Sequence, residues 1–246
     1  AALTELKKAV IADPHHTNAH FELGLIYLKK ASTILDITKR AQCFQGDARK
    51  EKEEEAQALL AMAKKHFLQS ARNKQLTSKA HNNVSAIEIH FGNNESAIEH
   101  AKKSTSDLVY QDSYVANTNI GWAYYHLKQF KKSIPYFKQA LLIQSKYCLA
   151  RYRMGRSLFE LGEYSKAEKA LLRTVKQGPP CNSIQEAWLY LGLAQLKLGK
   201  HKNAVFALSR CKLISDQSCV SQKCEQHLKV IITHEQPHTE DEQPAP

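Results

Sequence analysis

The stretch "NTNIGWAYYHLKQFKKSIPYFKQALLIQS", residues 117–145, decides the fold. Its apolar residues recur at helical spacing, which predicts two helices. Pro135 falls in the first turn of the second helix, where a missing N–H costs little. The same pattern returns further along the chain. Four pairs of similar residues are each 34 positions apart: Gly121 and Gly155, Phe130 and Tyr164, Ser133 and Ala167, and Phe137 and Leu171.

A period of 34 residues with these residue types is the signature of tetratricopeptide repeats. Each repeat is a pair of antiparallel helices that cannot bury its apolar faces alone, so the repeats stack into a solenoid. We expect Gly121 to let the second helix pack close to the first. Ser133 is expected to be small because the two helices cross at that point.

The pattern extends in both directions from this stretch. Downstream, residues 148–180 form the next repeat, and Gly192 follows Gly155 by 37 positions, which predicts a longer loop around residues 178–181. Upstream, one repeat has Ser85 in place of the packing glycine. An earlier repeat contains Gly24, and about 27 residues are inserted between its two helices. Residues 1–14 fit a second helix without its partner, and residues 219–234 fit an amphipathic capping helix.

The sequence therefore predicts an all-α fold, a right-handed solenoid of about five and a half tetratricopeptide helix hairpins with a C-terminal capping helix. We expect the solenoid to span residues 1–233, with an insertion at about 30–58. Residues 234–246 lack apolar periodicity and are expected to form a disordered tail. The opening "AALTELKKAV" reads as the middle of a longer chain, so we expect the native protein to extend upstream.

The 246-residue chain carries a net charge of +11. A basic body is one feature of nucleic-acid-binding proteins. Here the Lys and Arg residues are scattered along amphipathic helices instead of clustering, which favours solvated faces and predicts no nucleic-acid partner. No apolar run approaches the roughly 20 residues that a membrane-spanning helix needs.

Two histidine patterns suggest metal sites, and both are weak. "HEQPH" at residues 234–238 matches a zinc-peptidase motif, but Pro237 disrupts the helix which that chemistry requires. His16 and His20 lie one helical turn apart without further ligands, so we favour a structural role for His20. No phosphate-binding loop or nucleophile motif is visible. The sequence predicts no enzyme activity, no cofactor and no metal.

The chain has six cysteines and no C-x-x-C pair. This excludes zinc ribbons and thioredoxin-like chemistry. Three cysteines lie close together around the last repeat and the capping helix, and we predict at least one disulfide among them: Cys211, Cys219 and Cys224. In a reducing compartment these residues would instead serve as small core side chains.

In such a solenoid the first helices of the repeats line a concave groove where partners bind. Helical spacing predicts which residues point into this groove: Asn82, Asn83, Ala86, Ile89, Thr118, Asn119, Trp122, Tyr125, His126, Tyr152, Arg153, Arg156, Phe159, Leu189, Leu193 and Leu196. Trp, Tyr and Arg often dominate binding energy at interfaces. Trp122, with Tyr124 and Tyr125, is therefore the candidate hot spot. The alternative is that Trp122 and Phe159 only pack between neighbouring repeats.

Residues 81–143 resemble the type IV pilus lipoproteins PilF, PilW and Tgl. The resemblance rests on three features: the Asn82–Asn83 pair, the segment from Asp107 to Tyr110, and Asn119 with Gly121 in the following helix. It covers about residues 1–210. It also implies that Tyr110 belongs to the partner-binding groove.

This resemblance implies a pilotin, a scaffold that helps the pilus secretin to reach the outer membrane and form multimers. Pilotins face the periplasm and are anchored by a lipidated cysteine, which this chain does not include. Ser85, the insertion and the Cys-bearing cap depart from the family pattern. The alternative is a generic adaptor or a co-chaperone-like peptide-binding scaffold in the cytoplasm. Only Asn119 and Arg153 fit the clamp that chaperone tails require.

Overall fold

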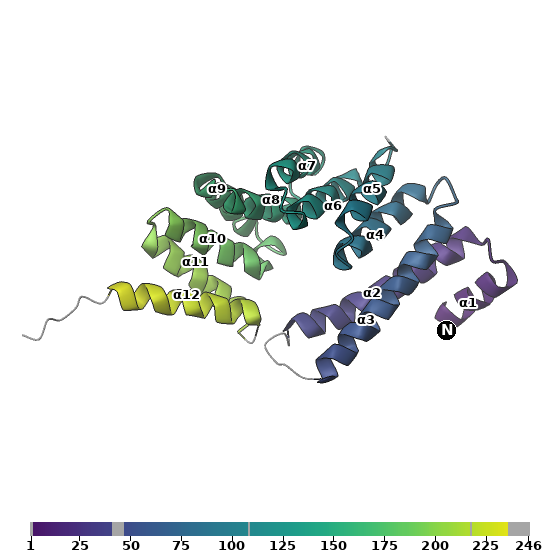
Figure 1. Cartoon of the computed structure of the whole chain (residues 1–246), viewed down its shortest axis with the longest axis horizontal. Helices are drawn as coiled ribbons and strands as arrows, with labels where there is room; N and C mark the ends of the chain where they lie inside the picture. Colours follow the sequence, from purple (N-terminus) through teal and green to yellow (C-terminus); the bar gives the residue numbers. More distant parts are fainter. Residues whose placement is uncertain (1, 41–46, 108, 217, 236–246) are drawn as a thin grey trace, which may run out of the picture.

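The computed structural model describes residues 2–40, 47–107, 109–216 and 218–235. Within these ranges every regular element is helical (Figure 1). The helices are α1 (Ala2–Ala12), α2 (Thr17–Arg40), α3 (Asp47–Ser70), α4 (Thr77–His90), α5 (Asn94–Thr105), α6 (Ser113–His126), α7 (Phe130–Ile143), α8 (Cys148–Glu160), α9 (Tyr164–Val175), the short 3-10 helix η1 (Cys181–Ser183), α10 (Gln185–Lys197), α11 (His201–Ile214) and α12 (Cys219–Glu235).

The helices pair into hairpins that stack along the chain (Figure 1). We call the first helix of each hairpin A and the second B. Repeats 1 to 5 are then α2–α3, α4–α5, α6–α7, α8–α9 and α10–α11, with α1 as a lone B helix before them and α12 as a cap after them. Each A helix packs against its own B helix and against the B helix of the preceding repeat. The predicted helical solenoid of five and a half hairpins with a cap is confirmed.

A glycine of the A helix contacts a large side chain of the B helix in four repeats. A Cβ atom added at Gly121 would lie 2.8 Å from the ring of Phe137, and one added at Gly155 would lie 2.7 Å from Leu171. Gly192 meets Leu208 in the same way. The packing role predicted for the glycines is therefore confirmed at equivalent contacts.

In repeat 2 the A-helix residue at this contact is larger than glycine, and the B-helix residue is smaller than Phe or Leu. Ser85 stands where the other repeats have glycine, and Ala101, sixteen residues later, stands where they have Phe or Leu. Both are fully buried. A small B-helix residue thus makes room for the larger A-helix residue, so the departure at Ser85 leaves the hairpin intact.

The insertion lengthens the first hairpin. Helices α2 and α3 each span 24 residues, against 12 to 14 in the helices of repeats 2 to 5. Phe67 packs on Gly24, 43 positions away. This separation is the sixteen of the other repeats plus 27, the length of the predicted insertion. Residues 41–46, within the predicted insertion, lie outside the described residues.

Two disulfides are defined in the C-terminal half. Cys211 of α11 is bonded to Cys224 of α12, with their Cα atoms 6.2 Å apart. Cys148, at the start of α8, is bonded to Cys181 of η1. Cys219 is also disulfide-bonded. The sequence interpretation did not identify the Cys148–Cys181 bond, because Cys181 lies in the connection after repeat 4, 33 positions from Cys148, and no local spacing joins them.

Two histidines from facing helices pair inside the first repeat. His20 is 6% exposed, and its Nδ1 lies 2.8 Å from Nδ1 of His66. The His20 Nε2 lies 3.1 Å from the Pro14 carbonyl oxygen, so Nε2 carries the proton and donates it. With the proton on Nε2, Nδ1 accepts from His66. This is the structural role predicted for His20.

The far end of the chain is only partly described. Helix α12 extends to Glu235 and so includes the first two residues of the segment predicted as a tail. The rest of that segment, with most of the "HEQPH" motif, lies outside the described residues. Among the helices that are described, none combines the length and apolarity needed to cross a membrane.

Candidate partner-binding surface

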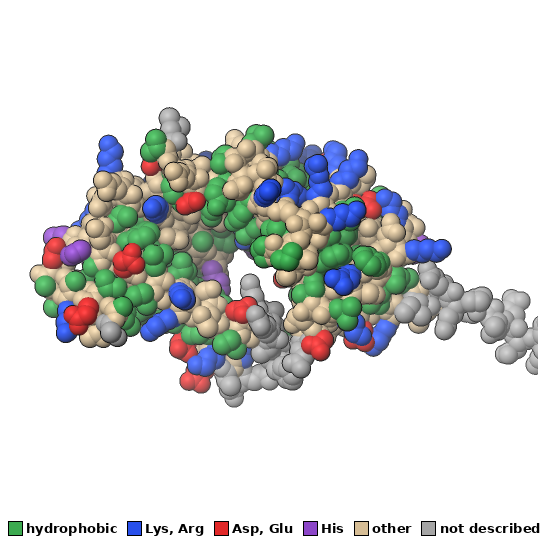
Figure 2. All heavy atoms as spheres, turned by 180° about the vertical axis from the view of Figure 1, so that it is seen from behind, with side chains coloured by type: hydrophobic (Ala, Val, Ile, Leu, Met, Phe, Trp, Pro, Cys, Tyr) green, Lys and Arg blue, Asp and Glu red, His purple; other side chains and the backbone are tan. Residues whose placement is uncertain are grey.

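The solenoid curves so that repeats distant in sequence face one another across a hollow (Figure 2). A cavity of about 460 Å³ in this concave side is lined by Leu28 and Leu35 of α2, Ile87 of α4 and Arg153 of α8. Helix α8 belongs to repeat 4 and α2 to repeat 1. Their approach places the A helices on the inner face, as the repeat pattern predicts.

The centre of this face is built around Arg156 of α8. Its guanidinium lies 4.9 Å from the ring of Tyr125, 4.6 Å from that of Tyr190 and 5.1 Å from that of Trp122. Its Nη2 donates to the hydroxyls of Tyr125 (3.0 Å) and Tyr190 (3.1 Å), and its Nη1 donates to that of Tyr152 (3.2 Å). Three successive repeats are joined by this one cation.

Trp122 extends the cluster towards the hollow. Its ring stacks on Tyr125 with centroids 4.5 Å apart, and the Arg153 guanidinium covers it at 4.7 Å. His126, which is exposed, meets the Trp122 ring edge-on. We call Trp122, Tyr125, Arg153, Arg156 and Tyr190 the cation–aromatic surface.

The contacts of this surface follow the repeat register. Trp122 lies one position after the packing Gly121, and Arg156 lies one after Gly155. Arg153 and Tyr190 each lie two positions before the glycine of their own repeat. Trp122 therefore meets Arg153 as Arg156 meets Tyr190, between successive repeats. A cation–π contact thus forms at the same place between repeats 3 and 4 and between repeats 4 and 5. In the first contact the earlier repeat supplies the ring, and in the second it supplies the cation.

Burial and the neighbouring hydroxyls fix the protonation states. Burial lowers the pKa of Arg153 to about 10, so it remains a cation at neutral pH. Burial also disfavours the cation of Arg156, but the surrounding tyrosine oxygens outweigh this and raise its pKa above the ordinary value. Burial raises the pKa of Tyr125 and Tyr152. At neutral pH the two cations therefore lie beside the neutral phenols of Tyr125 and Tyr152.

Arg153 is the cation that is free to bind. In the described part of the chain its guanidinium forms no hydrogen bond or ion pair; its cation–π contact is with the Trp122 ring, and Tyr147 and Tyr152 lie near enough to interact with its charge. Arg156 is occupied by the three hydroxyls, although its buried Nε has no hydrogen-bond partner there. Arg156 thus fixes the aromatic rings, while Arg153 offers charged donors to a ligand.

Three of the predicted groove residues form a polar cluster between repeats 2 and 3. Nδ2 of Asn119 donates to Oδ1 of Asn82 at 3.0 Å, and Nδ2 of Asn82 lies 3.2 Å from the Tyr110 hydroxyl. All three are at most 9% exposed. Burial raises the pKa of Tyr110 to about 12. These groups satisfy one another, so the prediction that they contact a partner is corrected to a role in joining the repeats.

Thr118 requires a second correction. It is fully buried, and its hydroxyl donates to the Tyr114 carbonyl at 2.8 Å. Neighbouring A helices contact one another, so part of the arc predicted to face the groove is covered. Asn83 is half-buried, and Tyr152 is buried beneath Arg156. Phe159 packs edge-on against Tyr164 and Tyr190, which matches the alternative that it fills the space between repeats.

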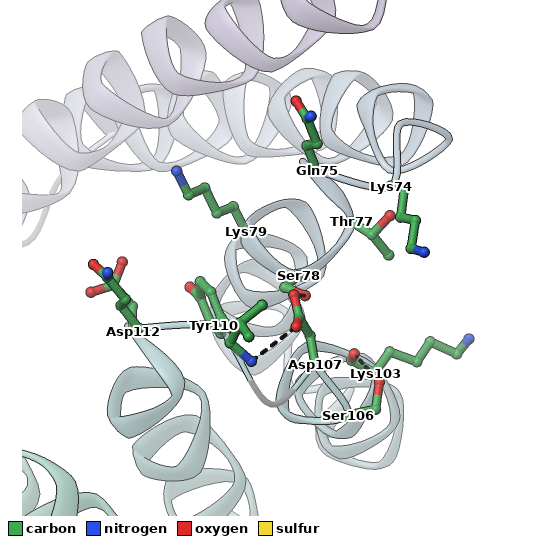
Figure 3. Close-up of a pocket in the computed structure, with 12 residues that line it drawn as sticks. Lys74, Gln75, Thr77, Ser78, Lys79, Lys103, Ser106, Asp107, Tyr110 and Asp112 are labelled. Atoms are coloured by element: carbon green, nitrogen blue, oxygen red, sulfur yellow. Dashed lines mark hydrogen bonds between the residues drawn. The ribbon is translucent and has the colours of Figure 1, made fainter.

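A hollow lies beside the polar cluster of Asn82, Asn119 and Tyr110, between the loops that precede α4 and α6 (Figure 3). The carboxylate of Asp107 accepts from the Ser78 hydroxyl and from the Val109 backbone N–H, each at 3.1 Å. These bonds tie the loop that carries Tyr110 to the start of α4. Asp107, which carries part of the family resemblance, is thus occupied in holding this loop.

Tyr190 is the member of the surface that sequence reasoning missed. The pattern did contain a signal, because Tyr190 occupies the same register as Asn119 and Arg153. In that helix the spacing assigned Leu189, Leu193 and Leu196 to the groove instead. The structure shows that Tyr190 supplies the third hydroxyl around Arg156.

The described residues include no group of three or more His, Cys, Asp or Glu side chains placed to hold a metal ion. The arrangement on the concave face is suited to binding instead. Flat rings, a guanidinium without a hydrogen bond, and a cavity lined by both apolar and polar side chains are features common in polypeptide-binding surfaces.

Comparison with known proteins supports this description. Tetratricopeptide-repeat family models match residues 114–147 and 152–210. The matches cover repeats 3 to 5, and the stacked hairpins of the described residues have the architecture of a tetratricopeptide-repeat solenoid, a fold common among protein-binding scaffolds. No curated protein sequence is significantly similar to the chain.

Several solved structures share the fold. The crystal structure of PilW, a widely conserved type IV pilus biogenesis factor, is 17% identical with a TM-score of 0.63, covering 89% of this chain and 87% of that one. PilF of Pseudomonas aeruginosa is 15% identical with a TM-score of 0.58, covering 85% and 99%. YrrB, a repeat protein with an unusual peptide-binding site, is 14% identical with a TM-score of 0.50, covering 90% and 97%. At these identities the likeness shows the fold alone.

Proposed function

We propose that this scaffold is a pilotin, which binds the type IV pilus secretin through the cation–aromatic surface and assists its multimerisation in the outer membrane. The observation that carries the binding role is the unpaired Arg153 guanidinium over Trp122, at the edge of the concave cavity. The pilus role is supported by the resemblance of residues 81–143 to pilus lipoproteins. PilW and PilF share the solenoid.

The disulfides support the periplasmic location that this role needs. Cys148–Cys181 and Cys211–Cys224 join separate elements of the fold. Disulfides persist in the bacterial periplasm and are rare in the cytoplasm, where thiols are kept reduced. In this proposal the membrane link is a lipid anchor upstream of Ala1.

Binding to purified secretin from the same organism tests the proposal. Trp122→Ala is expected to weaken binding more than tenfold, because truncating a central aromatic hot spot costs roughly 2 kcal/mol. Phe206→Ala removes an exposed aromatic from α11, outside the cation–aromatic surface, and should leave the affinity unchanged.

The possible outcomes separate the two levels of the proposal. If the wild-type chain does not bind secretin, and secretin multimers form normally in a strain that lacks it, the pilotin role is wrong. If secretin binds but Trp122→Ala and Phe206→Ala behave alike, the pilotin role stands and the proposed surface is wrong.

A further inference from the structure

A second groove lies on the opposite side of α8 from the cation–aromatic surface. It has a volume of about 1000 Å³ and runs between the B helices α7 and α9. Met154 and Leu158 of α8 reach its floor and Arg151 its rim, whereas Tyr152 and Arg156 of the same helix point to the concave face. The two sites are therefore separated by the thickness of the helix.

The groove combines an apolar floor with a basic rim. Ile134 and Leu141 of α7, Met154 of α8 and Leu172 of α9 are half-buried and line the floor. Six cations and one carboxylate lie around them: Lys138, Arg151, Lys166, Lys169, Arg173 and Lys176, with Glu163. Figure 2 shows Lys and Arg side chains gathered on this part of the surface.

Most of these cations lack a partner within the molecule. Arg151 donates hydrogen bonds to the Gln177 side chain and to the Ser145 carbonyl, and Lys166 forms an ion pair with Glu163. In the described part of the chain, no ion pair or side-chain hydrogen bond engages the other four rim cations, Lys138, Lys169, Arg173 and Lys176. All four are exposed.

The spacing of the basic residues on α9 carries an energetic cost. Lys166, Lys169 and Arg173 are separated by three and four positions, so their charges share one face of the helix. Like charges at these spacings destabilise a helix by a few tenths of a kcal/mol per pair. An anionic partner in the groove would relieve this repulsion.

We propose that this groove binds an acidic amphipathic segment of a partner protein, with apolar side chains on the floor and carboxylates along the rim. The inference goes beyond the secretin-binding role, because it concerns a separate face. A groove with an apolar floor between helices suits a polypeptide segment, whereas a flat anionic membrane would touch only the rim. The chain's own residues 235–246 carry four acids but no Leu, Ile, Val, Met or Phe, so they match the rim and not the floor.

A labelled synthetic peptide tests the proposal by fluorescence anisotropy. The probe is an acidic helical peptide with Leu at i, i+4 and i+7 and Glu on its flanks. It should bind, and the affinity should fall as salt is raised. The double variant Lys169→Glu with Arg173→Glu should weaken binding at least tenfold. Leu172→Asn, which changes the floor without changing the charge, should also weaken it.

Matched controls separate this site from charge alone. Lys102→Glu with Lys202→Glu makes the same change in net charge at exposed residues of α5 and α11, and should preserve binding. A probe with Lys in place of Glu, and a peptide of residues 235–246, should not bind. Trp122→Ala on the concave face should leave probe binding intact, which keeps the result independent of the secretin experiment.

Three outcomes would overturn the inference. The first is that the groove and control double variants lose affinity equally. The second is that the peptide of residues 235–246 binds as tightly as the probe, since charge alone would then suffice. The third is that phosphatidylglycerol vesicles bind through Lys169 and Arg173 while the probe does not.

Discussion

At the scale of single residues, each hairpin depends on the sizes of two contacting side chains, one on the A helix and one on the B helix. Where one is large, the other is small. Gly155 has no side chain because Leu171 occupies that space, and Ser85 is tolerated because Ala101 is small. Protein interiors are close-packed, so neither partner has room to change alone. In repeats 2 to 5, pairs of residues sixteen positions apart therefore form the unit of packing.

Gly155→Ala tests this unit. The added methyl group meets Leu171 at 2.7 Å, so the variant should lose about 1–3 kcal/mol of unfolding free energy. Leu171→Ala alone should also destabilise, through a cavity. The double variant should lose less than the sum of the two, and urea unfolding measures all three. Additive losses would show that the two residues do not share one contact.

The histidine pairs add a pH-dependent term at the same scale. Burial, together with repulsion from His20, lowers the pKa of His66 to about 4, and burial lowers the pKa of His81 and His100, which pair across repeat 2. The unfolded chain binds protons below about pH 6.5, where these folded rings stay neutral.

We therefore expect the unfolding free energy to be fully maintained above pH 6.5 and to fall between pH 6.5 and about 4. Thermal unfolding followed by circular dichroism at several pH values measures this. His66→Gln should flatten part of the dependence, while His201→Gln, at an exposed site, should leave it unchanged. A pH dependence of His66→Gln identical to that of the wild type would contradict this account.

At the scale of elements, the helices could be predicted from periodicity and the links between distant elements could not. The glycine register at Gly121, Gly155 and Gly192 defined the hairpins, and the delayed partner of Gly24 revealed the insertion. The Cys148–Cys181 bond depends on how η1 folds back on α8, which no local pattern records. Thr118 was misplaced because spacing gives a direction on a helix but not what a neighbouring helix covers.

The disulfides give a prediction for these elements. Replacing Cys211 and Cys224 by Ala removes a disulfide that joins residues 13 positions apart. The unfolding free energy should fall by about 3 kcal/mol, because the unfolded chain gains conformational entropy. Replacing Cys148 and Cys181 opens a link of separation 33 and should cost about 0.8 kcal/mol more. Urea unfolding of the two double variants compares them, and equal stability to the wild type in both would exclude this contribution.

At the scale of the whole molecule, the core is divided unequally along the solenoid. Among the described residues the largest apolar cluster joins repeats 4 and 5 to the cap, while the clusters between repeats 2 and 3 and between repeats 3 and 4 are small. Stacked repeats are stabilised mainly by their neighbours, so opening free energies follow these local contacts.

Hydrogen exchange should show this division. Backbone amides of α8 to α11 are expected to exchange more slowly than those of α4 to α7, because more buried apolar contacts and two disulfides hold the former. Mass spectrometry of peptic fragments measures the rates. Slowest exchange in α4 to α7 would contradict the unequal distribution.

The central claim is that the concave face, at the cation–aromatic surface, contacts the partner. Site-specific photo-crosslinking with benzoylphenylalanine tests it most directly, using purified secretin. The exposed His126 lies against Trp122, and the exposed Phe206 lies on α11, outside this surface. The account predicts that secretin is crosslinked from position 126 and not from position 206. Crosslinking from position 206 alone, with secretin bound, would contradict it.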